Sequence, residues 1–184
     1  MVNKNCNLPL KDKQLGTEMK DALIDILEEL DYQYEIDEDG SINFLLNPDN
    51  YTDEVRSFVE GVEFYIVFNV GSRIITVNEG CWKQIKSDDY DEAGRLLEAI
   101  NRANAGFHVT SYININSSSH MTEVYSSTHY PYLPDKEYLK EQLDNKISEI
   151  IFANKIINQF MEEATNEDAR QMFAEAMLKR QNPN

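Results

Sequence analysis

Zinc sites and proton transfer both favour the imidazole side chain, so the histidines are the first candidates for chemistry. The chain has three, His108, His120 and His129, and none stands at the HExxH or HxH spacing that places two ligands on one metal. A zinc site would have to be assembled by the fold from distant segments. A single histidine on a polar strand face is more often solvated, so the sequence predicts no metal site.

An acidic segment follows the spacing that opens an EF-hand calcium loop, with Glu35, Asp37, Asp39 and Gly40 in the first places. The twelfth place of such a loop must hold a bidentate glutamate, and here it is Leu46. Strand alternation explains the same residues, so we expect no calcium site.

The sequence lacks the motifs that catalysis and nucleotide binding commonly use. It contains no G-x-S-x-G elbow, no P-loop and no G-x-G-x-x-G, and it has only seven glycines. The acid pairs Asp88 and Asp89, and Glu162 and Glu163, are sequence neighbours, which do not face each other on a helix. We therefore predict no catalytic residue, no cofactor and no enzymatic activity.

One alternative is a small-molecule or enzymatic site on the last two predicted strands. It would be lined by His108, Tyr112, Tyr125 and His129. A deep pocket that joins these side chains would support this alternative, whereas a flat polar sheet face would remove it.

Other conspicuous side chains have structural interpretations. Asn101 and Asn104 stand at the end of a predicted helix, where asparagine caps free carbonyl groups. We expect the single tryptophan, Trp82, to pack against the sheet rather than to anchor a partner. Cys6 and Cys81 offer neither a disulfide framework nor a CxxC spacing, which is typical of free thiols in a reducing compartment.

Charge narrows the class of partner. The formal net charge is −16, and the segment 18–63 holds fifteen acids against two basic residues. Such a field opposes the contacts with phosphates that nucleic acids and anionic membranes require. Basic proteins or peptides fit better, although acids that only keep the protein in solution are the simpler interpretation. With no apolar run of membrane-spanning length, we expect a cytoplasmic protein.

Hydrophobic periodicity predicts helices alternating with antiparallel strands. Thr17 is the expected N-cap of a first helix that reaches Leu30, and Asp89 is the expected N-cap of a second helix that ends near Asn104. The predicted strands are 32–36, 42–46, 62–68, 73–77, 107–115 and 121–130. The segment 55–59 is ambiguous between a helical turn and a strand, and we favour the strand.

A long helix is predicted from Asp135 to about Ala164, followed by a short helix from Thr165. Apolar residues surround most of the second half of the long helix, so that half must be covered on several sides. Either the short helix or a second copy of the chain could cover it. The expected interface residues are Ile150, Phe152, Ile156, Ile157, Phe160, Met161, Met172, Phe173 and Met177.

This order of elements resembles that of the YbjN-type proteins, whose fold is similar to that of type III secretion chaperones. The resemblance spans Glu18 to Met161, and its most telling segment is Leu96 to Ser111, where a helix ending Ile-Asn-Arg-Ala-Asn passes through Gly-Phe into a strand. It implies a helix-backed antiparallel sheet, frequent dimerisation and a role in binding or regulating other proteins. The extra helix after Thr165 departs from that pattern and puts the family's dimer surface in doubt.

The predicted fold class is α+β, an antiparallel β-sheet meander backed by helices, similar to type III secretion chaperones, with a C-terminal helical extension. Residues 1–16 are expected to be a flexible N-terminus, 17–134 the sheet domain, and 135–184 a long and a short helix packed on the domain or extending from it. The predicted function is a non-enzymatic, chaperone-like or regulatory protein-binding module that forms a homodimer. The alternatives are a helical tail that docks a partner protein, and a domain that binds an unknown small molecule.

Overall fold

The computed structural model describes residues 10–53, 55–56 and 61–163. Its helices are α1 (Leu10–Glu29), α3 (Tyr90–Gly106) and α4 (Lys136–Glu163), with a short 3-10 turn η1 (Pro48–Asn50). Its strands are β1 (Gln33–Ile36), β2 (Ile42–Leu45), β3 (Glu63–Asn69), β4 (Ile74–Lys86), β5 (Thr110–Asn116) and β6 (Met121–Pro131).

The strands form one six-stranded sheet in the order β1-β2-β3-β4-β6-β5, and every neighbouring pair is antiparallel. The first four strands follow one another as a meander, as predicted. After α3 the chain enters β5, and β6 then returns between β5 and β4. The sheet therefore ends at β1 on one side and at β5 on the other. The predicted α+β class is confirmed.

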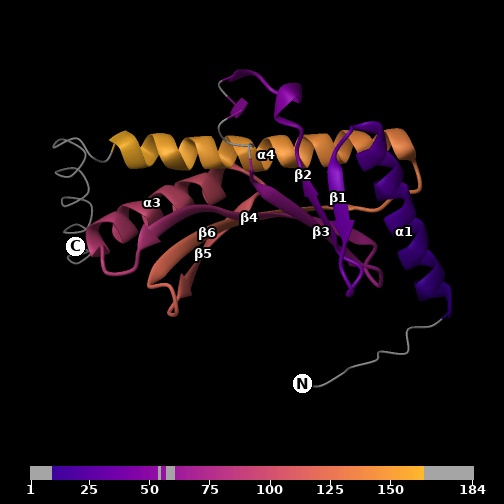
Figure 1. The fold of residues 1–184 in the computed structure, drawn as a ribbon, viewed down its shortest axis with the longest axis horizontal. Coiled ribbons are helices and arrows are strands. Elements are labelled where there is room, and N and C mark those ends of the chain that lie inside the picture. Colours follow the sequence, from indigo (N-terminus) through magenta and orange to yellow (C-terminus); the bar gives the residue numbers. More distant parts are fainter. Residues whose placement is uncertain (1–9, 54, 57–60, 164–184) are drawn as a thin grey trace, which may run out of the picture.

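All three helices pack on one face of the sheet. Figure 1 shows α4 running along the sheet, with α1 at the β1 end and α3 at the opposite end. Burial alternates along β6 because every second residue of a strand points to the same face, here the face that the helices cover. Those inward residues are Thr122, Val124, Ser126, Thr128 and Tyr130, all buried. No helix within the described residues is both long and apolar enough to cross a membrane.

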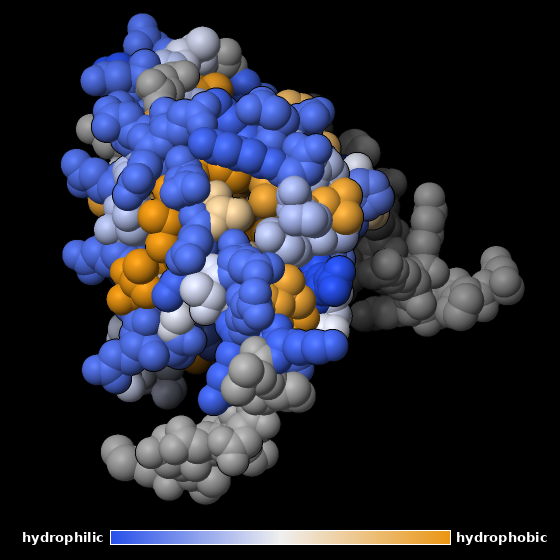
Figure 2. Space-filling view, turned by 90° about the vertical axis from the view of Figure 1, so that its right-hand side faces the viewer, coloured by the Kyte–Doolittle hydropathy of each residue, from blue (hydrophilic) through white to orange (hydrophobic). Residues whose placement is uncertain are grey.

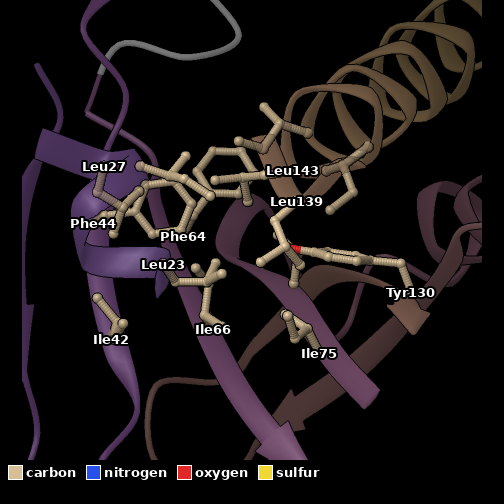
Figure 3. Close-up of a cluster of buried hydrophobic side chains, with 14 of the residues drawn as sticks. Leu23, Leu27, Ile42, Phe44, Phe64, Ile66, Ile75, Tyr130, Leu139 and Leu143 are labelled. Carbon is tan, nitrogen blue, oxygen red and sulfur yellow. The ribbon is translucent and has the colours of Figure 1, made fainter. Parts of the chain in front are cut away.

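The larger core cluster joins α1, the first strands and the first half of α4 (Figure 3). Phe44 and Phe64 lie 5.6 Å apart, ring centre to ring centre, beneath Leu27 of α1. Leu139 and Leu143 of α4 are fully buried against the same cluster. The described part of the C-terminal extension therefore belongs to the core of the sheet domain.

A second cluster lies under α3. Leu96, Ala99, Ile100 and Ala103 of α3 pack against Ile157 and Met161 of α4 and against the sheet. The apolar second half of α4 is thus covered by the sheet on one side and by α3 on another, which the periodicity alone did not reveal. The predicted N-cap of α3 is confirmed, since Asp89 accepts a hydrogen bond from the main-chain N–H of Glu92 at 2.9 Å.

Two predicted boundaries differ from the structure. Helix α1 begins at Leu10, so Thr17 is no N-cap; its hydroxyl donates to the carbonyl of Lys13 one turn back. The strand favoured at 55–59 is wrong for its described residues, which are helical. The N–H of Arg56 donates to Thr52 at 2.9 Å, and its guanidinium pairs with Asp49, so local bonds decide this ambiguous segment.

Candidate functional site

The face of the sheet opposite the helices carries a group of aromatic and amide side chains beside three glutamates, Glu35, Glu63 and Glu123. Alternation places on it Tyr65 and Val67 of β3, Asn78 of β4, Tyr125, Ser127 and His129 of β6, and Tyr112 and Asn114 of β5. We call this set the tyrosine face. No helix of the described residues packs on it, because both core clusters lie on the other side.

Two tyrosines of neighbouring strands stack on this face. Tyr112 and Tyr125 are register partners, and their rings are 5.7 Å apart at an angle of 15°. The hydroxyl of Tyr125 donates to Glu123 Oε2 at 2.8 Å. That bond to a carboxylate, together with some burial, raises the pKa of Tyr125 to about 12. Tyr125 is therefore uncharged at neutral pH, and its ring forms an aromatic platform with the ring stacked on it.

A third tyrosine reaches toward this pair across the sheet. Tyr65 lies on β3, two strands from Tyr125 and three from Tyr112, yet burial and the approach of the Tyr112 hydroxyl both raise the pKa of Tyr65. Asn78 of β4 is the register partner of Tyr65 and is 8% exposed, and its side chain donates to the carbonyl of Tyr65 at 3.4 Å. The aromatic rings thus shelter main-chain and amide groups of the middle strands.

An irregularity in β4 gives the face its form. The pairing of β4 with β6 shifts between Glu79 and Lys83, so three residues of β4 oppose Tyr125 alone. Such a bulge bends its strand and increases the local twist. Gly80 stands in the bulge because a β-carbon there would lie 3.0 Å from the carbonyl oxygen of Glu63 on β3.

Directly behind the bulge, a carboxyl group is fully buried on the helix side. Glu79 is 0% exposed, and Asn154 of α4 donates its side-chain N–H groups to both oxygens at 2.7 Å. Burial raises the pKa of Glu79 to about 8, against the opposing bonds from Asn154 and Ser126. At neutral pH this carboxyl is mostly protonated, which is how a lone acid is tolerated in a core without a cation.

The polar contacts continue from Glu79 to the edge of the sheet. Ser126 donates to Asn154 Oδ1 at 3.1 Å, and the hydroxyls of Ser126 and Ser111 lie 3.1 Å apart. Asn104 at the end of α3 then binds the main chain of Ser111, accepting from its N–H at 2.7 Å and donating to its carbonyl at 2.9 Å. Asn104 therefore holds β5. The predicted capping role is wrong for Asn104, because α3 continues to Gly106 and its C-cap is Phe107.

The four residues of the alternative small-molecule site do not converge. Tyr112 and Tyr125 stack, whereas His129 lies farther along β6 and His108 precedes β5, with its carbonyl accepting from Thr128 at 3.0 Å. Two hollows in the described residues lie elsewhere. One is lined by Phe107, Gln142, Asn145, Lys146, Ser148, Glu149 and Phe152, and the other lies at the α1 end. In Figure 2, which faces the α1 end, hydrophobic patches lie between hydrophilic side chains.

The expected interface residues of α4 divide into buried and exposed sets. Ile150, Ile157 and Met161 are buried within the chain. Phe152 is 50% exposed and packs edge to face on Phe107, while the ring of Phe160 carries the guanidinium of Arg102 at 4.0 Å. Ile156 is partly buried, and Met172, Phe173 and Met177 lie outside the described residues.

In the segment whose spacing resembles an EF-hand loop, Asp37 and Asp39 accept hydrogen bonds from residues in or next to the turn between β1 and β2. Asp39 accepts from the N–H and hydroxyl of Ser41, and Asp37 accepts from Ser41 and Asn43, around the positive φ of Gly40. Among the described residues no cluster of three or more His, Cys, Asp or Glu side chains could hold a metal ion.

Comparison with known proteins gives a limited result. No protein-family model matches the chain, and no curated protein matches it. Among solved structures, a chain of the HopA1–SchA chaperone–effector complex is similar over 80% of this chain and 95% of its own, with 12% identity and a TM-score of 0.45. A likeness of this size carries no argument about function. Membership of the YbjN-type family stays a prediction.

Proposed function

We propose that this chain is a non-enzymatic protein-binding module whose tyrosine face takes a basic polypeptide segment, in the manner of a chaperone or regulator. One observation carries the proposal: all three helices cover one face of the sheet, and the other face presents the stacked pair Tyr112 and Tyr125. Tyrosine offers a large and rigid contact area at a low cost in conformational entropy. Aromatic residues are enriched at protein interfaces for that reason.

Charge supports a basic partner. Alternation places Glu35, Glu63 and Glu123 on the same face as the tyrosines, within a chain of net charge −16. Opposite potentials speed encounter and disfavour acidic partners, so lysine- and arginine-rich segments are selected over others. The amides of Asn78 and Asn114 offer donors and acceptors to a partner's main chain.

A selection from a phage-displayed library of unstructured random peptides tests this proposal on the full chain. The wild type should enrich basic peptides, and the double variant Tyr112→Ser/Tyr125→Ser should bind them at least about tenfold more weakly, as the loss of interface anchors does. Leu97→Ser is the matched control, because Leu97 is 44% exposed but lies on α3, away from the tyrosine face. Peptides that bind the double variant as well as the wild type, or that show no basic preference, would contradict the proposal.

A further inference from the structure

The open edge at β5 differs from the rest of this acidic chain. Residues 103–122, which contain all of β5, include no Asp, Glu, Lys or Arg, although 27% of the whole chain is charged. Natural proteins protect sheet edges with charges, prolines, bulges or short strands. The opposite edge follows that rule, since β1 has only four residues and one of them is Glu35. Strand β5 has seven residues and none of these protections.

The contact of Asn104 shows which main-chain groups of β5 point outward. Because Asn104 binds both the N–H and the carbonyl of Ser111, these groups face away from β6. Outward and inward groups alternate along an antiparallel strand, so those of Ile113 and Ile115 also face outward. Within the described residues, neither of these two has a recorded hydrogen-bond partner on that side. The free donors and acceptors of the edge therefore begin at Ile113.

A side chain beside these groups is also uncovered. Ile115 is 66% exposed, the highest value among the large hydrophobic residues that the structure describes as exposed. Its side chain is on the helix side of the sheet, as is that of Ile113. A strand laid along β5 would cover Ile115 with its own residue opposite.

From these observations we propose that β5 pairs antiparallel with β5 of a second copy of this chain, with Ile113 of each copy opposite Ile115 of the other. Two chains of charge −16 repel each other at most contacts, and the uncharged edge is where they can meet. In both copies Asn104 already binds the outward N–H and carbonyl groups of Ser111. This excludes the registers in which the partner strand would bind those two groups. Among the symmetric registers that avoid Ser111, the one with Ile113 opposite Ile115 satisfies the outward N–H and carbonyl groups of both residues within β5 and buries both Ile115 side chains. It goes beyond the proposed function by joining the two tyrosine faces into one continuous surface.

The solution mass of the full chain, measured by light scattering across a concentration series, tests the pairing. The wild type should be a dimer, and Ile115→Lys should be a monomer over the same range. Ile36→Lys is the matched control, because Ile36 is 46% exposed on the opposite edge strand. A wild type that stays monomeric overturns the proposal and leaves the edge to an extended segment of another protein. A dimer that Ile115→Lys leaves intact overturns it as well.

Cysteine crosslinking tests the register itself. In the proposed pairing Asn114 lies opposite Asn114 of the second copy, in a non-hydrogen-bonded pair with α-carbons about 4.5 Å apart, within disulfide reach. In a background of Cys6→Ser and Cys81→Ser, Asn114→Cys should oxidise to a covalent dimer. Tyr112→Cys should not, because its two copies lie about 13 Å apart. Equal crosslinking of the two variants, or none at Asn114→Cys, would show that this register is wrong. The tyrosine face is intact in the monomeric Ile115→Lys variant, so this variant should still select basic peptides if the proposed function is right. Failure of the pairing and failure of the proposed function are therefore distinguishable.

Discussion

Replacing the buried acid Glu79 by glutamine should stabilise the protein, and the gain should grow with pH. Glutamine has the shape of a protonated glutamate, and its Oε1 can accept the hydrogen bond that Asn154 donates at 2.7 Å. In the wild type, burial raises the pKa of Glu79 from 4.5 to about 8. Because the folded state holds this proton more tightly than the unfolded chain, unfolding releases it between these pH values. Stability therefore falls as the pH rises through this window.

The size of the effect follows from the two pKa values. At about 1.4 kcal/mol for each pH unit, the gap from 4.5 to about 8 corresponds to at most about 5 kcal/mol. Below pH 4.5 the acid is protonated in both states, and the two proteins should differ little. From there the difference in unfolding free energy should widen steadily, reach about 3 kcal/mol at pH 7 and level off above pH 8.

Urea unfolding at a series of pH values from 4 to 9, followed by the fluorescence of Trp82, measures this difference. Glu63→Gln is the control for the loss of one negative charge, because Glu63 is exposed on the same sheet. Stability curves of wild type and Glu79→Gln that run parallel across the whole range would refute the reasoning. They would mean that the buried carboxyl keeps the same charge in the folded and unfolded states.

Two further substitutions probe packing. Gly80→Ala places a β-carbon 3.0 Å from the carbonyl oxygen of Glu63 and should lower the unfolding free energy by about 1–3 kcal/mol. The control Gly94→Ala, inside α3 with open space around it, should raise it by roughly 0.5–1 kcal/mol, and a loss at both sites would contradict this contrast. The buried hydroxyl of Tyr130 has no hydrogen-bond partner within the described residues, so Tyr130→Phe should cost nothing or stabilise by about 1 kcal/mol in thermal unfolding. A loss above that size would show that the hydroxyl is bonded.

The elements that could be predicted are those with one buried face. Such a helix or strand shows its period in the sequence, as α3 does from Leu96 to Ala103, and a capping side chain such as Asp89 marks its start. The hairpin of β1 and β2 was predictable for the same reason, since Gly40 supplies the positive φ that its turn needs.

The features that escaped prediction depend on partners distant in the sequence. In the sequence, nothing distinguishes Glu79 from the other acids among the 33 of the chain. Its burial depends on the contact with Asn154, which lies 75 residues later. The bulge after it breaks the alternation, so β4 was expected to end near Val77 although it continues to Lys86. The one signal available in the sequence was the polar Asn154 at helical spacing among the apolar residues Ile150, Ile151 and Ile157.

The buried polar chain and the open edge of the sheet have a common physical origin. Glu79 needs an amide donor, and Asn154 supplies it while its own oxygen accepts from Ser126. Ser126 in turn lies against Ser111, whose main chain is held by Asn104. This sequence of contacts fixes the outer side of β5 at Ser111 and leaves the outer side of the rest of the strand unpaired, while β6 pairs with its inner side. An edge strand that is already ordered loses less conformational entropy when a second strand pairs with it than a frayed strand does. The buried contacts that start at Glu79 therefore lower the entropy cost of pairing at β5.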